Sequence, residues 1–177
     1  RWVFKKWCDK HDKELIIEKS RLYSYYRPTR ATARQTAIDI FLDNFNEGWL
    51  MFIDDDVIIN KGWWDEAKQY MDDPLVGLIW GVNWDATPYR MKYLRIFGAD
   101  YREYLIRAFE ARGGLHDTLI RREAIEGIFI PPELHILEDG YVKWYIQCRG
   151  WEYRILETGI IHYNPWRPED VVRNGEY

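Results

Sequence analysis

An apolar segment that runs into three consecutive acids is the part of this sequence best suited to chemistry. Trp49–Ile53 is followed directly by Asp54, Asp55 and Asp56, and then by the apolar Val57–Ile59. Short continuous apolar runs are typical of buried parallel strands, and ligands of open α/β sheets gather at the carboxyl ends of such strands. Adjacent carboxylates repel one another unless a cation lies among them, and oxygen-only clusters suit Mg²⁺ or Mn²⁺. The pattern therefore favours a metal site for a diphosphate over an acidic turn or a helix cap.

A second pair of acids, Glu138 and Asp139, stands before Gly140 at the predicted start of a helix. Aspartate is a preferred N-cap residue, and acids in a first turn complement the helix dipole. Taken alone, this motif favours a cap over a catalyst. A helix N-terminus also keeps a carboxylate ionised, as a general base must be, so the two roles are compatible.

Two histidines stand close to other polar residues. His162 follows an apolar segment near the end of the chain. A single histidine is more often a hydrogen-bonded structural residue than a ligand, but one imidazole joining two carboxylates would suit Mn²⁺. His116 follows Gly113 and Gly114 and precedes Asp117, where a plain turn is favoured over a loop that positions a substrate.

Three arginines, Arg27, Arg30 and Arg34, surround the start of the helix expected from Ala31. Spaced basic residues at a helix start could hold phosphates, and a solvated basic face explains them equally well. No GxGxxG or GxxxxGKS/T motif is present, which argues against nucleotide-dependent dehydrogenases and P-loop enzymes. Neither of the two serines lies in a GxSxG motif, so a serine hydrolase is not supported.

Length and composition fit a single domain with a core. The chain has 177 residues, of which 47% are hydrophobic and 31% charged, and its net charge of −4 argues against broad binding of nucleic acid. No apolar run approaches the length of a membrane span, although basic clusters at Arg21–Arg34 and Arg121–Arg122 leave peripheral membrane contact open. Cys8 and Cys148 are isolated, which fits a reducing cytoplasm. The aromatic residues, 17% of the chain, are assigned by default to the core, with stacking on sugars as the alternative.

The elements that must position these residues alternate between strands and helices. Strands are predicted at Glu14–Glu18, Trp49–Ile53, Leu75–Val82, Thr118–Ile120, Tyr153–Leu156 and Gly159–His162. Helices are predicted at Arg1–Lys10, from Ala31 to the turn at Asn46–Gly48, and at Trp63–Met71, Arg121–Glu126 and Asp139–Cys148. The predicted inner face of the helix from Ala31 consists of Ala33, Ala37, Ile40, Phe41 and Phe45. Alternation of this kind favours an α/β fold with helices on both faces of a sheet.

The order of these motifs resembles that of the GT-A glycosyltransferases, and most closely the large inverting family two. The resemblance covers roughly Glu14–Pro165: a strand ending in an acid, a helix with Arg34, the strand into Asp54–Asp56, the Glu138–Asp139 pair before a helix, and His162. It implies an α/β/α sandwich of the GT-A (Rossmann-like) type with a mostly parallel central sheet. It also implies one catalytic domain over residues 1–177, with the family's first strand upstream of residue 1. In size the chain is similar to minimal members of the family from archaeal viruses, which implies a host cytoplasm.

The resemblance also implies roles for single residues. Asp139 would be the catalytic base. The donor, a nucleotide-diphosphate sugar, would be bound with a Mn²⁺ or Mg²⁺ cofactor. The implied donor contacts are Glu18, Arg34, Asp54 and Asp55, the metal ligands are Asp54, Asp56 and His162, and the substrate contacts are Glu138, His116 and Trp80. The acceptor would be a hydroxyl of a glycan, a protein or a lipid-linked sugar.

One departure from the family pattern narrows the expected activity. The family's Gln-x-x-Arg-Trp motif is absent, and this chain has Gln147–Trp151 in its place, which favours transfer of a single sugar over processive synthesis. Two other classes stay open. A magnesium-dependent nuclease or nucleotidyltransferase also gathers carboxylates around metal, and a non-catalytic carbohydrate-binding module would use the aromatic residues for stacking.

Overall fold

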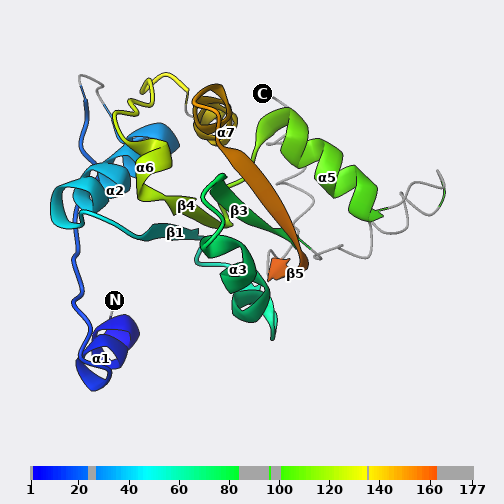
Figure 1. Ribbon diagram of the computed structural model, residues 1–177. Helices are drawn as coiled ribbons and strands as arrows, with labels where there is room; N and C mark the ends of the chain where they lie inside the picture. Colours follow the sequence, from blue (N-terminus) through cyan, green and yellow to red (C-terminus); the bar gives the residue numbers. More distant parts are fainter. Residues whose placement is uncertain (1, 24–26, 84–95, 97–100, 135, 163–177) are drawn as a thin grey trace.

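The computed structural model describes residues 2–23, 27–83, 96, 101–134 and 136–162, which form one five-stranded sheet with helices packed against it (Figure 1). The helices are α1 (Trp2–Lys10), α2 (Arg30–Asn44), α3 (Trp63–Met71), α5 (Tyr101–Arg112), α6 (Arg122–Ile125) and α7 (Glu138–Cys148). The strands are β1 (Trp49–Ile53), β2 (Val57–Ile59), β3 (Val76–Asn83), β4 (Asp117–Arg121) and β5 (Glu152–His162).

The sheet is mixed and mainly antiparallel, with strand order β1-β4-β3-β5-β2. Only the β3–β5 pair is parallel, whereas β1–β4, β3–β4 and β2–β5 are antiparallel. The expected GT-A sandwich with a mostly parallel sheet is therefore wrong. The apolar run of β1 also does not mark a buried parallel strand, because β1 lies at the sheet edge, where Trp49, Leu50 and Met51 are only half-buried.

The return of the chain after α5 explains the direction of β4. The Gly113–His116 segment brings the chain back to the end of the sheet where β1 finishes, so that Ile53 lies opposite Asp117. From that end β4 can only run antiparallel to β1. Alternation of strands and helices predicts which elements exist, but it does not fix at which end of the sheet a connection returns.

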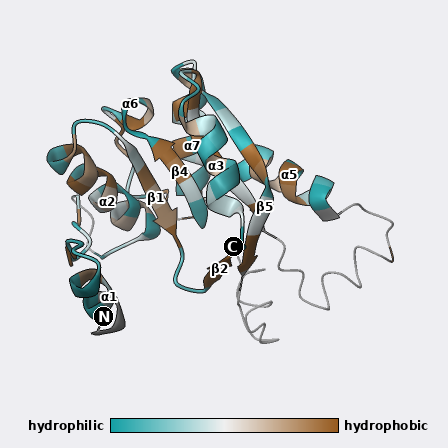
Figure 2. Cartoon of the chain, turned by 60° about the horizontal axis from the view of Figure 1, so that its bottom comes forward, coloured by the Kyte–Doolittle hydropathy of each residue, from teal (hydrophilic) through white to brown (hydrophobic). Residues whose placement is uncertain are grey.

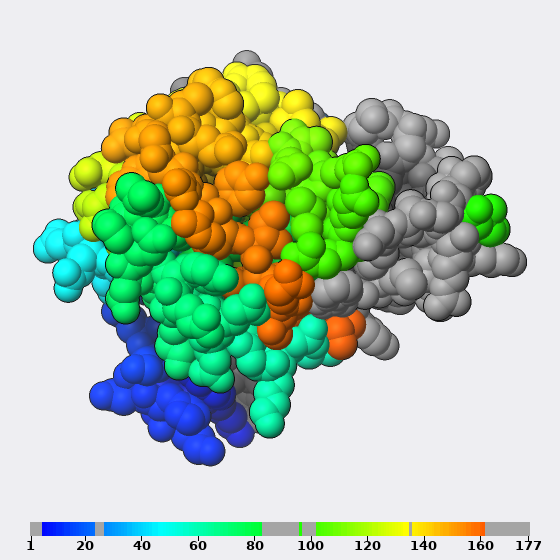
Figure 3. Space-filling view, turned by 45° about the vertical axis from the view of Figure 1, so that its right-hand side comes forward, coloured from blue at the N-terminus to red at the C-terminus, as the bar shows by residue number. Residues whose placement is uncertain are grey.

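Helices cover both faces of the sheet. Leu78, Trp80 and Val82 of β3 point to one face, where they join a core formed with α2, α5, α6 and α7. Ile79 points to the other face and packs in a second cluster with Trp63 of α3. Figure 2 shows that β1 and β4 consist mainly of apolar residues. In Figure 3 the atoms of α5 and α7, which belong to the first core, lie side by side. The alternation along β3 follows from the two-residue period of a strand.

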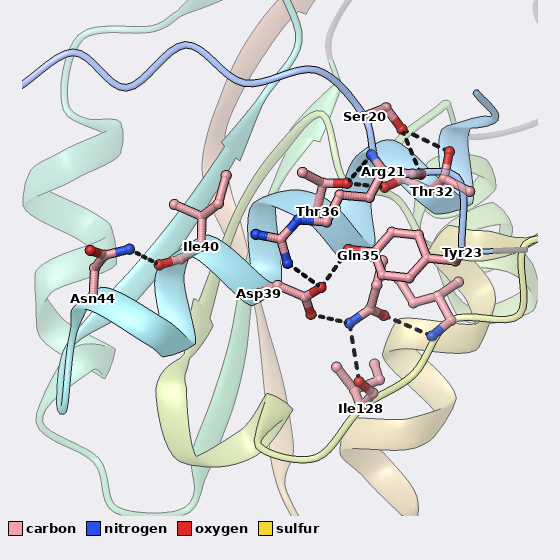
Figure 4. Close-up of polar contacts among 11 residues, drawn as sticks. Ser20, Arg21, Tyr23, Thr32, Gln35, Thr36, Asp39, Ile40, Asn44 and Ile128 are labelled. Atoms are coloured by element: carbon pink, nitrogen blue, oxygen red, sulfur yellow. Dashed lines mark hydrogen bonds and ion pairs between the residues drawn. The ribbon is translucent and has the colours of Figure 1, made fainter. Parts of the chain in front are cut away.

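Helix α2 is held by a network of polar contacts rather than by a purely apolar face (Figure 4). Thr29 and Thr32 form a capping box at its start. Gln35 donates from Nε2 to the carbonyl of Ile128 at 3.2 Å and accepts from the backbone N–H of Ile130 at 2.8 Å. These bonds tie the loop between α6 and α7 to α2.

The residues that α2 buries differ from the predicted face. Ala33 is exposed, Ala37 and Ile40 are half-buried, and Phe45 follows the helix as its C-cap. Only Phe41 of the predicted set is buried. The buried residues of α2 are Ala31, Thr32, Gln35, Thr36, Ile38 and Phe41. Three polar residues belong to this set because their hydrogen bonds are met inside the protein, which a pattern of apolar residues cannot reveal.

Most other predicted elements are confirmed, and two are not. Glu14–Glu18 forms no strand and is exposed, so the apolar pattern there has no sheet partner among the described residues. The two strands predicted after Gly150 are one strand, β5. From the sequence, Tyr89–Gly98 and Tyr101–Phe109 are each expected to be irregular or helical. Tyr101–Phe109 lies in helix α5, whereas nearly all of Tyr89–Gly98 falls outside the described residues.

None of the helices in the described part of the chain is long and apolar enough to cross a membrane. Both cysteines are free thiols: Cys8 is buried in α1 and Cys148 is exposed at the end of α7.

Candidate active site

The side chains suited to chemistry meet where β1 ends and where β4 and α7 begin. The backbone N–H of Asp54 donates to the carbonyl of His116 at 3.1 Å, which joins the end of β1 to the loop before β4. That loop in turn packs against α7 with no room for side chains. A Cβ on Gly113, whose φ is +73°, would lie 2.6 Å from the carbonyl oxygen of Asp139, and a Cβ on Gly140 would lie 2.9 Å from that of Arg112. Two glycines therefore allow the close approach of the loop to the first turn of α7.

Arg34 and Asp54 form an ion pair across the site. Arg34 Nη2 lies 3.0 Å from Asp54 Oδ1, and both side chains are largely shielded from solvent. The guanidinium carbon of Arg34 also lies 5.0 Å from the centre of the Phe52 ring. The hydrogen-bond network around α2 fixes the helix that carries Arg34. The Arg34 guanidinium group is thereby held beside the Asp54–Asp56 segment.

Glu138 and Asp139 occupy the first turn of α7, and neither caps the helix. The N-cap residue is Leu137, whose side chain makes no capping hydrogen bond. Among the described residues, Glu138 Oε2 and Asp139 Oδ1 are buried atoms without a hydrogen-bond partner. Glu138 as a whole is 2% exposed. Buried polar atoms are nearly always hydrogen-bonded, so two adjacent exceptions mark a place that a ligand could complete.

Burial changes the protonation of both acids. Burial, together with the neighbouring Asp139 carboxylate, raises the pKa of Glu138 to about 7, although Arg30 and Arg34 act in the opposite direction. Burial is also the main reason that the pKa of Asp139 is raised, and the charge on Asp54 adds to it. Arg34 opposes that rise, so the same arginine that pairs with Asp54 favours the ionised form of Asp139.

A buried chain of hydrogen bonds holds the Gly113–His116 loop and the start of β4 in place. Asp117 is fully buried, and its two oxygens lie 2.9 Å from the indole Nε1 of Trp63, which donates, and 2.5 Å from Nδ1 of His116. His116 Nε2 accepts from the indole Nε1 of Trp80 at 3.3 Å. Burial raises the pKa of Asp117, while the contacts to His116 and Trp63 oppose that rise. Accepting from Trp80 at Nε2 favours the His116 tautomer that carries its proton on Nδ1, facing Asp117.

The predicted substrate contacts differ in how they are placed. Glu138 and His116 both lie at the site. Glu138 directly precedes Asp139 in α7, and the charge of His116 acts to lower the pKa of Asp139. Trp80 is 3% exposed and stacks on Phe109 with ring centres 4.2 Å apart. Its role in the described structure is to orient His116, and its assignment to the substrate stays a prediction.

The predicted metal ligands are brought together in part. Asp54 pairs with Arg34, and Asp56 is half-buried. Asp55, which was predicted as a donor contact and not as a metal ligand, is exposed. Val57, directly after Asp56, lies opposite His162 in the β2–β5 pair. The backbone therefore places Asp56 and His162 at the same end of that pair. The side chain of His162 lies outside the described residues, and within them no group of three metal-binding side chains comes together.

Glu18, the remaining predicted donor contact, lies apart from these residues. It is exposed in the segment that connects α1 with α2, and no described hydrogen bond or ion pair joins it to the site. Ser20 and Arg21, shortly after it, bind Thr32 and Thr36 of α2 (Figure 4). The segment is thereby anchored to the helix that carries Arg34.

Sequence reasoning missed Asp117. It treated the Gly113–Asp117 region as a plain turn, yet this aspartate supports His116 and is among the most buried residues of the chain. A histidine next to an aspartate at the start of an apolar strand is a signal that could have raised the question. The partners that explain it, Trp63 and Trp80, are distant in sequence and give no local pattern.

No family model, curated protein or solved structure matches this chain. The chemistry of the site therefore has to be interpreted from its own residues. Glu138, whose pKa is about 7, can take up a proton near neutral pH, and the raised pKa of the neighbouring Asp139 makes that carboxylate a stronger proton acceptor.

Proposed function

We propose that this chain is a metal-dependent glycosyltransferase that moves a single sugar from a nucleotide-diphosphate sugar to an acceptor hydroxyl with inversion. The observation that carries this proposal is Asp139: its Oδ1 is buried, has no hydrogen-bond partner among the described residues, and lies within the electrostatic influence of Arg34 and His116. The order of the sequence motifs supports it. Since the sheet is not the one that the resemblance implied, the proposal rests on these side chains, because chemistry is carried by sites and not by folds.

Asp139 would act as the general base. Its raised pKa makes the carboxylate a better proton acceptor, and Arg34 keeps the ionised form available. The proton of the acceptor hydroxyl would pass to the Asp139 carboxylate as the acceptor oxygen bonds to the anomeric carbon. The bond from that carbon to the diphosphate oxygen breaks, and the nucleoside diphosphate leaves with the electron pair. A single displacement of this kind inverts the anomeric configuration.

Glu138 would help to hold the acceptor. With a pKa of about 7, its carboxyl group is protonated in part of the molecules at neutral pH and can donate or accept a hydrogen bond. Its partnerless Oε2 lies beside the proposed base in the same helical turn. His116 would lie on the same side, held in one tautomer by Asp117 and Trp80.

A divalent cation would be held by Asp56 and His162, with Asp54 nearby. The register of β2 and β5 places His162 opposite Val57, next to Asp56, and an oxygen and an imidazole nitrogen are ligands that suit Mn²⁺. Bound there, the cation would neutralise charge on the leaving diphosphate. Asp54 is already paired with Arg34, so a carboxylate oxygen of Asp54 would accept a hydrogen bond from a ribose hydroxyl of the donor.

Asp139→Asn tests this function directly. Transfer from a panel of UDP- and GDP-sugars, with Mn²⁺ or Mg²⁺, is expected to fall about 10²–10⁴-fold, because a positioned base supplies that much of the rate. Binding of the nucleoside diphosphate is expected to stay unchanged. Asp65→Asn, at an exposed acid of α3, is the matched control and should retain full transfer.

The rival classes give different results in the same panel. Transfer that continues unchanged in Asp139→Asn would remove Asp139 from its role. Turnover of phosphodiesters in place of sugar transfer would point to a nuclease or nucleotidyltransferase. Glycan binding that is insensitive to EDTA, without any turnover, would point to a carbohydrate-binding module.

A further inference from the structure

Exposed apolar residues and arginines lie on the segments around the start of α2, in the loop between α6 and α7 and directly before α7. This set, called here the arginine–apolar rim, consists of Leu22, Arg27, Arg30, Phe129, Ile136 and Leu137. We propose that the arginine–apolar rim docks the protein onto a lipid bilayer that carries anionic headgroups. The proposal concerns binding to a surface and does not require the transfer activity.

Contacts on either side of the rim show that its segments belong together. The ring of Tyr23, next to Leu22, lies 6.2 Å from that of Phe129. Thr29 Oγ1 donates to the carbonyl of Pro132 at 3.2 Å, which joins the start of α2 to the loop between α6 and α7. In Figure 1 that loop lies at the top beside α7, and the two chain ends beside residues 24–26 lie on its other side, at the upper left.

The rim also reaches the acid pair. Leu137 directly precedes Glu138, and the charge of Arg30 lowers the pKa values of both Glu138 and Asp139. A surface that covers the rim would therefore lie next to the proposed base.

The apolar members of the rim are large side chains that the protein leaves in water. Leu22 is 45% exposed, Phe129 52%, Ile136 47% and Leu137 58%. Single exposed apolar residues are common, but a group of them on segments that contact one another is typical of an interaction surface. Leucine, isoleucine and phenylalanine gain by leaving water for the outer part of a bilayer.

Neither arginine of the rim forms an ion pair within the described residues, although the charge of Arg30 lowers the pKa values of Glu138 and Asp139. Arg27 and Arg30 are exposed, and among the described residues no carboxylate lies within ion-pair distance of either. Arginines next to apolar side chains suit an anionic bilayer, where the apolar groups enter the interface and the guanidinium groups meet phosphates. Two copies of the protein that met through this rim would bring their arginines together, which disfavours self-association as the explanation. The net charge of −4 for the whole chain also means that attraction to an anionic surface must be local.

The rim would restrict the acceptor if the proposed function holds, and this consequence rests on that function. An acid pair at the edge of a bilayer would act on a hydroxyl that is presented at the membrane surface, such as that of a lipid-linked sugar. A soluble glycan in bulk water would be a poorer acceptor.

Co-sedimentation with vesicles tests the docking itself, without donor and in EDTA. The two probes are phosphatidylcholine vesicles and vesicles of equal parts phosphatidylcholine and phosphatidylglycerol. The protein is expected to bind the anionic vesicles and to dissociate as salt is raised. Arg27→Gln and Arg30→Gln should each weaken the partition by about fivefold, and Leu137→Asn by about tenfold.

Matched variants outside the rim distinguish binding through the rim from non-specific adsorption of exposed apolar residues to vesicles. Leu75→Asn changes a leucine that is 56% exposed outside the rim, and Trp7→Asn changes an exposed tryptophan of α1. Both should leave vesicle binding unchanged. The proposal is overturned if neither vesicle is bound, if neutral and anionic vesicles are bound equally, or if the control variants lower binding while the rim variants do not.

The docking and the transfer activity fail separately. Vesicle binding without sugar transfer in any condition would leave the rim as a membrane surface and reject the proposed function. Transfer to a soluble acceptor without vesicle binding would support the proposed function and reject the rim as a membrane surface. Circular dichroism of each variant shows whether its fold is intact before binding is compared.

Discussion

Glu138→Gln is the change whose effect on stability follows most directly from the structure. Burial and Asp139 raise the pKa of this carboxyl group from its usual 4.5 to about 7. The folded protein therefore binds a proton at Glu138 more tightly than the unfolded chain. The stability that this proton contributes is fully present below pH about 4.5 and is lost as the pH rises through about 7.

The magnitude follows from the difference between the two pKa values. Each pKa unit corresponds to about 1.4 kcal/mol, so full ionisation of Glu138 costs the folded state about 3 kcal/mol. Glutamine has nearly the same shape and never ionises, so it removes this pH dependence. The free energy of unfolding of Glu138→Gln, minus that of the parent protein, should therefore rise by about 3 kcal/mol between pH 4.5 and pH 8.

Urea denaturation of both proteins at several pH values measures this difference. The amide of glutamine can itself lose or gain a hydrogen bond, which adds a constant to the difference in unfolding free energy between the two proteins. Because this constant is the same at every pH, it does not affect how the difference changes with pH. Glu123→Gln, at an exposed acid of α6, controls for the loss of one surface carboxylate. A difference between the Glu138 variant and its parent that stays constant from pH 4.5 to 8 would refute the assignment of a buried, protonated Glu138.

Three further changes test other parts of the site. Gly81→Ala would place a Cβ 2.0 Å from Asp117 Oδ2, and it should lower the free energy of unfolding in urea by about 2–4 kcal/mol; a stable variant would show that Asp117 is free to move. Asp117→Leu should cost a similar amount, because it leaves the Trp63 indole and His116 without an acceptor, and equal stability would contradict the buried hydrogen-bond chain. Asp56→Ala should weaken Mn²⁺-dependent binding of a nucleoside diphosphate in calorimetry, and equal affinity would exclude Asp56 as a ligand.

The sequence predicted elements whose pattern is local and failed where distant contacts decide. Helices α3 and α7 and strand β3 follow from periodicity and from their flanking glycine and proline residues, so they were expected within one or two residues. The direction of β4 depends on where the Gly113–His116 segment returns to the sheet, and there a Cβ added to Gly113 or Gly140 would lie 2.6 or 2.9 Å from the opposite backbone. That packing involves segments more than 20 residues apart and leaves no periodic signal.

The candidate site shows the same division. The Asp54–Asp56 segment was singled out as a candidate site because acids directly after an apolar run are a local signal. The local signal at Glu138 and Asp139 favoured a helix cap, and only the family resemblance implied that Asp139 is the base. That Arg34 pairs with Asp54 depends on the fold, since the two residues are 20 positions apart. The apolar run at Glu14–Glu18 misled for the opposite reason, because it has the local pattern of a strand without a strand to pair with among the described residues.

The acid pair is the point at which stability and chemistry conflict. A buried oxygen without a hydrogen-bond partner costs about 1–3 kcal/mol, and Glu138 and Asp139 supply two such atoms in one helical turn. A purely structural role would predict that removing either acid destabilises the protein. The proposed function predicts the reverse: near neutral pH, Glu138→Gln and Asp139→Asn should leave the protein as stable or more stable, because each removes a charge that is shielded from solvent. At the same time, Asp139→Asn should lower transfer by about 10²–10⁴-fold. Loss of stability in both variants, with transfer retained at the level of the folded fraction, would show that the pair serves the fold and not catalysis.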